Sequence, residues 1–181
     1  MTLTVALALG AGLVACGEDD ESTGGESGAT AAEQTPVPTE TAGTDPAAIA
    51  EQISEDLDAR PEIPAPEGAP PAELVTEDIV EGKGRAAKEG ALVAVQYAGA
   101  SWSTGQEFDA SWNSGQPFSF PLGAGQVIPG WDQGVAGMKK GGRRLLVIPP
   151  DLGYGPAGSP PVIAPNETLI FVVDMVDPSA N

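Results

Sequence analysis

The chain has 181 residues, 26 acidic and 8 basic side chains, no histidine and a formal net charge of −18. This length fits one domain with a tail, and the negative charge excludes a basic surface for nucleic acid. The absence of histidine and the single cysteine, Cys16, argue against zinc binding, disulfide bonds and thiol catalysis. We therefore expect no cofactor and no metal.

The N-terminus is predicted to be a processed export signal. Leu3–Val14 is an apolar run that is too short to span a bilayer but typical of the hydrophobic region of a signal peptide. It leads into LVACG at residues 13–17, which resembles the bacterial lipobox, where the cysteine is lipidated and begins the mature protein. We expect residues 1–15 to be a lipoprotein signal peptide and Cys16 to hold the protein on the extracytoplasmic side of a bacterial cell membrane.

Two alternatives remain for this segment, namely an ordinary secretory signal or a buried cysteine after an N-terminal helix. A signal peptide normally begins with Lys or Arg, and none precedes the apolar run. A start upstream of Met1 would account for this departure.

Residues 16–72 are predicted to form an acidic, disordered tether. From Gly17 to Ala72 there are fourteen acidic residues and one basic residue. Gly17–Thr44 consists largely of small and polar residues, which cannot bury enough apolar area to offset chain entropy. The prolines between Pro61 and Pro71 favour a stiffer spacer. We expect this tether to be dispensable for activity.

One short helix is predicted within the tether, over residues 46–58. Asp45 followed by proline is typical of a helix start, and the apolar residues that follow at helical spacing are Ile49, Ile53 and Leu57. Such a helix either docks on the domain or a partner, or frays in solvent. We favour the frayed helix because isolated helices of this length are marginally stable.

Residues 73–181 show the pattern of an antiparallel β domain. Strands are predicted around Leu74–Ile79 and over Arg143–Ile148. Val93, Val95 and Tyr97 alternate with small or polar residues, as in a half-buried strand, so Tyr97 is expected to face inward. The apolar residues that share one face of the last strand are Leu169, Phe171, Val173 and Met175.

A sheet with one buried face needs a cover, and the best helix candidate is Trp131–Met138. Glycines and a proline precede it, and Gly141 and Gly142 end it. Its apolar stripe consists of Trp131, Val135 and Met138. The predicted fold class is therefore α+β, with an antiparallel sheet curled around one short α-helix.

Six motifs then stand in a characteristic order. They are VQYAG at 95–99, FDAS at 108–111, PFSFPLG at 117–123, VIPGW at 127–131, GYG at 153–155 and TLIFVVDMV at 168–176. This order and spacing resemble the FKBP-type peptidyl-prolyl cis/trans isomerases over Glu73–Asp177. The resemblance implies the FKBP-like fold for residues 73–181.

The resemblance also implies a catalytic pocket. In the family the bound proline ring lies on the indole of Trp131, between Phe108 and Phe171. The Ile128 N–H and the Tyr154 hydroxyl are hydrogen-bond donors to ligand carbonyls, and Asp109 lies near the rim. The implied site residues are Tyr97, Phe108, Asp109, Phe118, Val127, Ile128, Trp131, Tyr154, Ile163 and Phe171.

The implied function is peptidyl-prolyl cis/trans isomerisation that assists the folding of extracytoplasmic proteins. The implied partners are proline-containing unfolded polypeptides and macrolide immunosuppressants, and the implied state is a monomer attached to the bilayer through Cys16. The alternatives are a weakly catalytic or non-catalytic polypeptide-binding module or chaperone on the same fold, and a structural lipoprotein whose β domain recognises another protein.

Two loops depart from the family pattern. The stretch ASWNSGQ at residues 110–116 lacks the basic residue common there in relatives, which affects the electrostatics of the rim. Ser159-Pro160-Pro161 stands where relatives often have His-Pro-Gly, so this loop is predicted to be stiffer.

Overall fold

The structure, a computed structural model, describes residues 45–179. The predicted signal peptide, Cys16 and the tether as far as Thr44 lie outside this range. Within the described range no helix is both long and apolar enough to cross a membrane.

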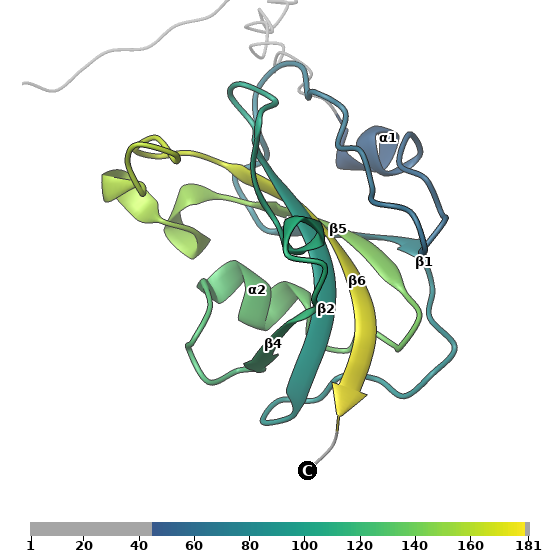
Figure 1. Cartoon of the computed structure of the whole chain (residues 1–181). Helices are drawn as coiled ribbons and strands as arrows, with labels where there is room; N and C mark the ends of the chain where they lie inside the picture. Colours follow the sequence, from purple (N-terminus) through teal and green to yellow (C-terminus); the bar gives the residue numbers. More distant parts are fainter. Residues whose placement is uncertain (1–44, 180–181) are drawn as a thin grey trace, which may run out of the picture. The chain divides into compact units, whose positions relative to one another are not determined.

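The described residues form an antiparallel sheet of six strands. The strand order is β1-β5-β6-β2-β3, and β4 pairs with β2 (Figure 1). The strands are β1 (Val75–Val80), β2 (Leu92–Ser101), β3 (Glu107–Ala110), β4 (Phe118–Pro121), β5 (Arg143–Ile148) and β6 (Leu169–Ser179). The helices are α1 (Pro46–Ala50) and α2 (Pro129–Gly134), with 3-10 turns η1 (Ser111–Asn113), η2 (Pro150–Leu152) and η3 (Gly155–Ala157). The predicted α+β fold is confirmed.

The helix α2 covers one face of the sheet, as predicted, but its bounds differ from Trp131–Met138. It begins at Pro129, whose fixed φ suits the first turn of a helix. It ends at Gly134. Gly137 has a φ of +77°, a left-handed conformation in which a right-handed α-helix cannot continue. The whole predicted stripe is nevertheless buried, because Val135 and Met138 follow in a turn that packs on the same core.

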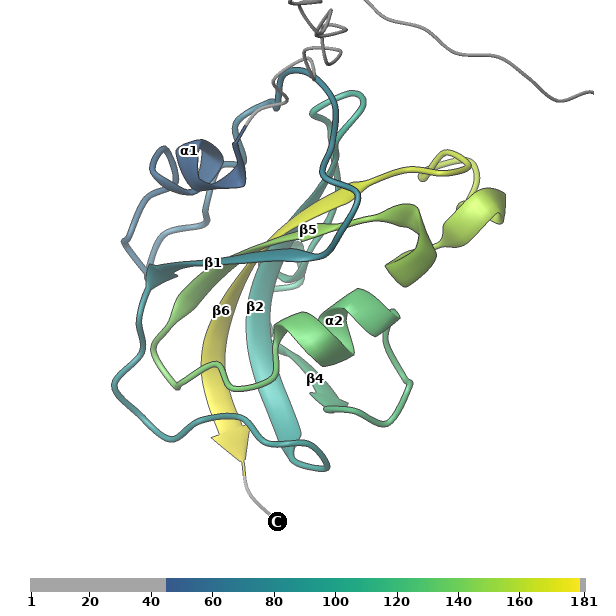
Figure 2. The same ribbon diagram turned by 180° about the vertical axis from the view of Figure 1, so that it is seen from behind.

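Both faces of the sheet are buried, whereas the sequence pattern predicted one. Alternate residues of β6 belong to two separate cores. Phe171 and Val173 pack in the core around Trp131, and Ile170 and Val172 pack in a second core on the other face. Figures 1 and 2 show α2 on one side of the sheet and α1 on the other.

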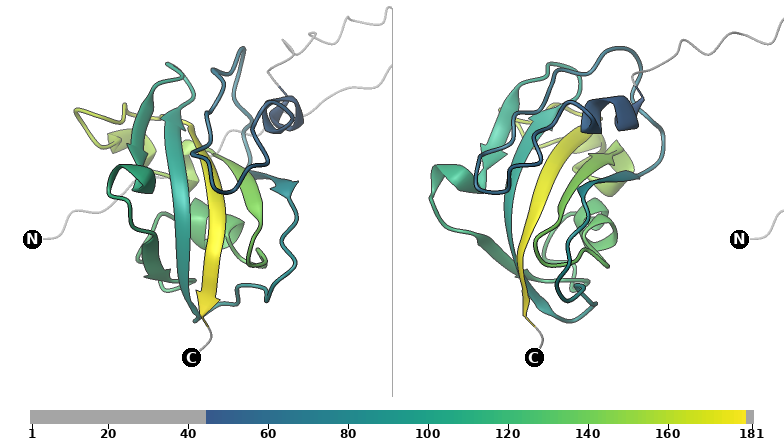
Figure 3. Two further views of the ribbon diagram at one scale, coloured as in Figure 1. Left: turned by 45° about the vertical axis from the view of Figure 1, so that its right-hand side comes forward. Right: turned by 90° about the vertical axis from the view of Figure 1, so that its right-hand side faces the viewer.

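The second core is closed by residues 45–68, which we call the N-terminal strap. In the left-hand view of Figure 3 it passes in front of the upper part of β6. Ile49 and Ile53 are 1% and 4% exposed, and they pack against strand residues that include Leu145 and Val147. The Trp102 indole, 5% exposed, donates its Nε1–H to the carbonyl oxygen of Gly68 at 3.1 Å.

The strap corrects two sequence predictions. A disordered tether does not extend to Ala72, because Ile49, Ile53 and Pro61 are buried and Gly68 accepts a hydrogen bond from Trp102. The helix docks on the domain and does not fray, although its α-helical part is limited to Pro46–Ala50. The physical reason is that a short helix gains its stability from burying an apolar face against tertiary partners.

A buried ion pair fixes the strap to the sheet. The fully buried guanidinium of Arg143 donates to both carboxylate oxygens of Asp174, at 2.6 and 2.7 Å. In the strap, the carbonyl oxygen of Ser54 accepts from Nη1 of Arg143, and the carbonyl oxygen of Ala59 accepts from Nη2. Burial raises the pKa of Asp174, and the hydrogen bonds from Arg143 oppose that change. The strap therefore adds two hydrogen bonds to a buried charge, which would be costly to leave unpaired.

Candidate functional site

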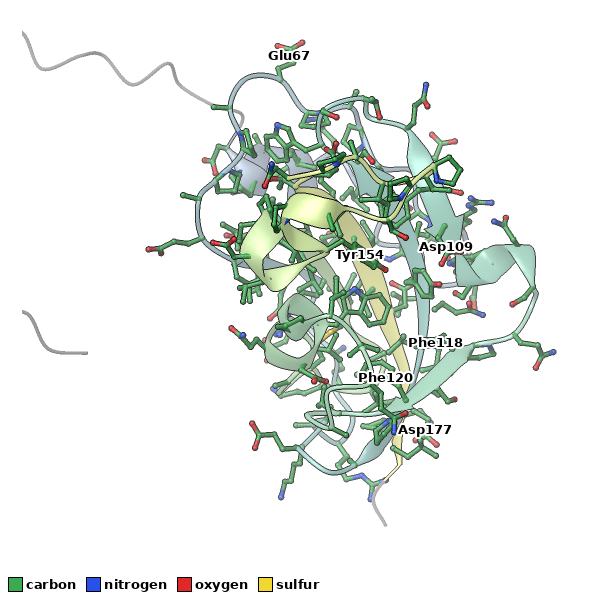
Figure 4. The ribbon with its side chains drawn as sticks, turned by 90° about the vertical axis from the view of Figure 1, so that its left-hand side faces the viewer. Glu67, Asp109, Phe118, Phe120, Tyr154 and Asp177 are labelled. Atoms are coloured by element: carbon green, nitrogen blue, oxygen red, sulfur yellow. The ribbon has the colours of Figure 1, made fainter. Side chains whose placement is uncertain are left out.

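A cavity of about 470 Å³ opens between α2, the strands β2 to β4 and the loop that follows β5. Tyr154, Asp109 and Phe118 come from three separate segments and lie close together on the side of the molecule seen in Figure 4. The residues that line the cavity are Tyr97, Phe108, Asp109, Phe118, Gly125, Gln126, Val127, Ile128, Trp131, Tyr154 and Phe171.

All the predicted site residues except Ile163 therefore meet in one cavity. Ile163 is 5% exposed and belongs to the core beside it. Sequence reasoning missed Gly125 and Gln126, although these residues directly precede the VIPGW motif.

The floor of the cavity is aromatic. The Trp131 ring lies 5.0 Å from Tyr97, 5.2 Å from Phe171 and 6.1 Å from Phe118 between centroids, each in an edge-on arrangement. Such edge-to-face contacts are a favoured geometry for aromatic pairs. Because Trp131 is 4% exposed and touches rings from three strands, its indole is held in one orientation.

A β-bulge brings two consecutive residues of β3 into the same cavity. Gly99 pairs with Asp109, but the next residue of β2, Ala100, pairs with Glu107, so Phe108 is unpaired in the ladder. In a regular strand Phe108 and Asp109 would point to opposite faces. A bulge redirects side chains in this way and is common beside functional sites.

Gly99 makes room for the aromatic wall. A Cβ atom at this position would lie 2.6 Å from Cε1 of Phe171 and 3.0 Å from Cζ of Phe108. The two rings therefore approach the bare backbone of β2 and contact each other with centroids 5.5 Å apart. Any side chain at Gly99 would displace at least one of them.

Asp109 and Tyr97 form a polar pair in this otherwise aromatic cavity. The Tyr97 hydroxyl donates to Asp109 Oδ2 at 2.5 Å. Burial raises the pKa of Tyr97 well above its ordinary value, and the hydrogen bond to Asp109 and its negative charge act in the same direction. Tyr97 is therefore a neutral donor at physiological pH, and this bond orients the Asp109 carboxylate.

The side chain of Asp132 fixes the loop that leads into α2. It accepts hydrogen bonds from the backbone N–H groups of Gly123, at 2.8 Å, and Gly125, at 3.0 Å. Gly125 has a φ of +66°, a conformation that glycine adopts without strain. The loop then reaches Ile128, whose carbonyl oxygen accepts from the N–H of Trp131 at 2.9 Å. Gln126 and Val127 are thereby held at the edge of the cavity.

The opposite edge is formed by Tyr154 and the loop after it. Tyr154 is 42% exposed. Ser159 and Ile163 exchange two backbone hydrogen bonds of 2.9 Å, and the buried Ile163 side chain anchors the loop that carries Pro160 and Pro161. Ile163 thus supports this edge from within the core.

The antiparallel sheet around one short helix, together with a cavity floored by the helix tryptophan, defines a protein of the FKBP-like α+β class. The sequence model of the family of FKBP-type peptidyl-prolyl cis-trans isomerases matches residues 83–176. The chain belongs to this family.

Relatives and solved structures agree with this assignment. An FK506-binding protein of Streptomyces anulatus is 59% identical over 118 residues, which cover 65% of this chain and 95% of the relative. A probable FK506-binding protein of Corynebacterium glutamicum is 45% identical over 117 residues, covering 65% and 97%. The crystal structure of AtFKBP13 matches with a TM-score of 0.54 and 37% identity, over 57% of this chain and 91% of that one. FkpA from Escherichia coli matches with a TM-score of 0.52 and 47% identity, over 57% and 47%.

Proposed function

We propose that the protein is a peptidyl-prolyl cis/trans isomerase that acts on proline-containing segments of unfolded or partly folded polypeptides. The observation that carries this proposal is the aromatic floor around Trp131, in a cavity where the ionisable lining groups contributed by residues 45–179 are Asp109, Tyr97 and Tyr154. This cavity suits an apolar ring with adjacent carbonyl groups better than a substrate that needs proton transfer.

The chemistry of the amide bond explains why such a cavity would be sufficient. Rotation about an X–Pro bond has a barrier of about 18 to 20 kcal/mol, because the planar amide is stabilised by resonance. The twisted amide has less charge separation than the planar one, so a desolvated apolar site favours it over the ground state. A differential stabilisation of roughly 6 to 8 kcal/mol would accelerate the rotation about 10⁴- to 10⁶-fold.

Each part of the cavity then has a role in the proposal. The proline ring lies on Trp131, between Phe108 and Phe171. The Ile128 N–H and the Tyr154 hydroxyl hold the carbonyl groups of the polypeptide while the prolyl side turns. The neutral Tyr97 keeps Asp109 oriented at the rim. This mechanism requires neither a covalent intermediate nor a general acid or base.

The test is a proline-isomerisation assay on the protein with a peptide series that varies the residue before proline. Acceleration of cis-to-trans conversion is expected for at least part of the series. If peptides bind and no peptide is turned over, the site is a non-catalytic polypeptide-binding module.

We further propose that the pocket binds macrolides of the FK506 type. The support is that the relatives named above are called FK506-binding proteins and that the cavity, at about 470 Å³, has the size of a small-molecule site. Titration calorimetry with FK506 tests this, and competition between FK506 and a proline peptide is the expected result.

We also propose that the protein works outside the cytoplasm, attached to a membrane by lipid at Cys16. The support is the apolar run followed by LVACG at residues 13–17. This places the proposed clients among exported polypeptides.

A further inference from the structure

A second groove of about 490 Å³ adjoins the pocket. It shares Tyr97, Asp109 and Phe118 with the pocket and continues along the loop 110–117. The hydrogen-bonded pair Tyr97–Asp109 therefore lies between two adjacent cavities. A ligand longer than a single proline residue could occupy both.

The inner wall of the groove is attached to β2. The Ser111 hydroxyl oxygen accepts the backbone N–H of Tyr97 at 2.8 Å and also bonds the side chain of Gln96. The Ser114 hydroxyl donates to the Ser111 carbonyl oxygen at 2.8 Å. Because this loop is bonded to the strand that carries Tyr97, the position of the groove relative to the pocket is fixed.

The outer wall is held by Arg60 from the N-terminal strap. Its Nη1 donates to Asn113 Oδ1 at 3.0 Å, and its Nη2 forms an ion pair with Glu107. Glu107 precedes the bulged Phe108 on β3, and Asn113 lies in η1, so one guanidinium joins the segments on both sides of Asp109. The loop 110–116 has no basic residue of its own, and the strap supplies one.

The chemistry of the groove fits a polypeptide backbone. Asn113 and Gln116 present exposed amide side chains that donate as well as accept hydrogen bonds. An extended peptide offers donors and acceptors in alternation. Asp109 is the charged residue of the lining and would favour a basic over an acidic side chain nearby.

We propose that this groove is a second subsite that binds the segment next to the proline held in the pocket, and that Arg60 is a positioning residue for its outer wall. This inference rests on the proposed function of the pocket. It assigns polypeptides of several residues, with a preference for Lys or Arg over Glu beside the proline, as the substrate class.

The test compares a four-residue proline peptide with versions lengthened by three residues on either side. The measured quantity is the ratio of kcat/KM for the long and short peptides, in wild type, Gln116→Ala, Arg60→Gln and the control Gln106→Ala, which changes an exposed glutamine outside both cavities. One of the two extensions is expected to raise kcat/KM in wild type and in Gln106→Ala. In Gln116→Ala the ratio is expected to fall toward one.

Arg60→Gln is tested by hydrogen exchange in addition to the ratio of kcat/KM. Hydrogen exchange of the amides in residues 111–116 is expected to become faster in this variant, because the loop loses its bond to the strap. In wild type, Lys at the flanking position is expected to give a kcat/KM about two- to fivefold higher than Glu, and added salt should reduce this difference.

The proposal is overturned if neither extension raises kcat/KM, or if the gain persists in Gln116→Ala. An absence of turnover on all peptides would contradict the proposed isomerase function and not the groove. In that case calorimetric binding of the long and short peptides still tests the groove, because a longer peptide that binds no tighter than the short one contradicts the second subsite.

Discussion

At the scale of single residues, the site depends on a few positions that the backbone brings together. The bulge at Phe108 turns two neighbours into the cavity, and Gly99 leaves space for the rings. The residue identities were predictable, because the sequence motifs carry them. The bulge was not, since it depends on the pairing register with β2. Ile163 was predicted to line the pocket but lies in the core beside it. Sequence order does not show whether a residue lines the cavity or supports its wall from the core.

Phe108→Ala tests the aromatic wall. The substitution opens the cavity and admits water, which reduces the preference for the less polar twisted amide. We expect kcat/KM on a short peptide to fall by about tenfold or more, with the circular dichroism spectrum unchanged because Phe108 is at the cavity and only partly buried. A folded variant with the wild-type kcat/KM would contradict the assigned role.

Tyr97→Phe tests the polar pair through the pH dependence of stability. The pKa of Tyr97 is raised in the folded state, so the protonated phenol stabilises the fold below the ordinary tyrosine pKa of about 10, and this contribution is lost as the pH rises toward the folded pKa. Above pH 10 the free energy of unfolding of wild type should fall more steeply than that of the variant. The difference in slope is at most about 1.4 kcal/mol per pH unit and is reduced by the partial exposure of the ring.

Urea unfolding of both proteins between pH 8 and 11.5 measures this difference. Parallel stability curves for wild type and Tyr97→Phe would contradict the assigned shift in the pKa of Tyr97.

At the scale of elements, the strap is the main feature that the sequence analysis missed. The short helix was expected to fray, and docking on the domain, which was the alternative, is what the structure shows. A signal was present in the strands themselves, because Leu145, Val147, Ile170 and Val172 are apolar on the face opposite α2. A strand that is apolar on both faces indicates two buried faces. The strand positions and the covering helix were predictable because their periodicity follows from the burial of apolar side chains.

Removing the strap is therefore expected to destabilise the domain. A chain that begins at Glu73 loses the burial of Ile49 and Ile53, and each fully buried side chain of this kind contributes about 1.5 to 3 kcal/mol. The free energy of unfolding should fall by roughly 3 to 6 kcal/mol relative to a chain that begins at Asp45, a large part of the total for a small domain.

Urea titration followed by tryptophan fluorescence compares the two chains, and Lys83→Ala in the longer chain serves as a surface control. Equal midpoints for the chains that begin at Asp45 and Glu73 would show that the strap contributes no stability.

At the scale of the whole molecule, attachment and catalysis are assigned to separate parts of the chain. The expected lipid site, Cys16, lies upstream of the described residues, and the cavity lies within the family domain at residues 83–176. A lipidated Cys16 would carry two or more acyl chains, which anchor a protein stably. Cys16→Ser removes their attachment site, so it is expected to release the protein from the membrane fraction or to leave an unprocessed precursor. Fractionation of cells that express each form measures this. Wild-type protein found wholly in the soluble fraction would contradict lipid attachment.

The central claim is that this cavity accelerates rotation about X–Pro bonds without acid–base chemistry. The most direct test is the rate of cis-to-trans conversion of a proline peptide, measured with the protein from about pH 6 to 8. We predict a rate far above the uncatalysed one, nearly constant across this range and without a bell shape, because no general acid or base takes part. The account would be contradicted by a rate equal to the uncatalysed one for every residue before proline, or by a bell-shaped pH profile.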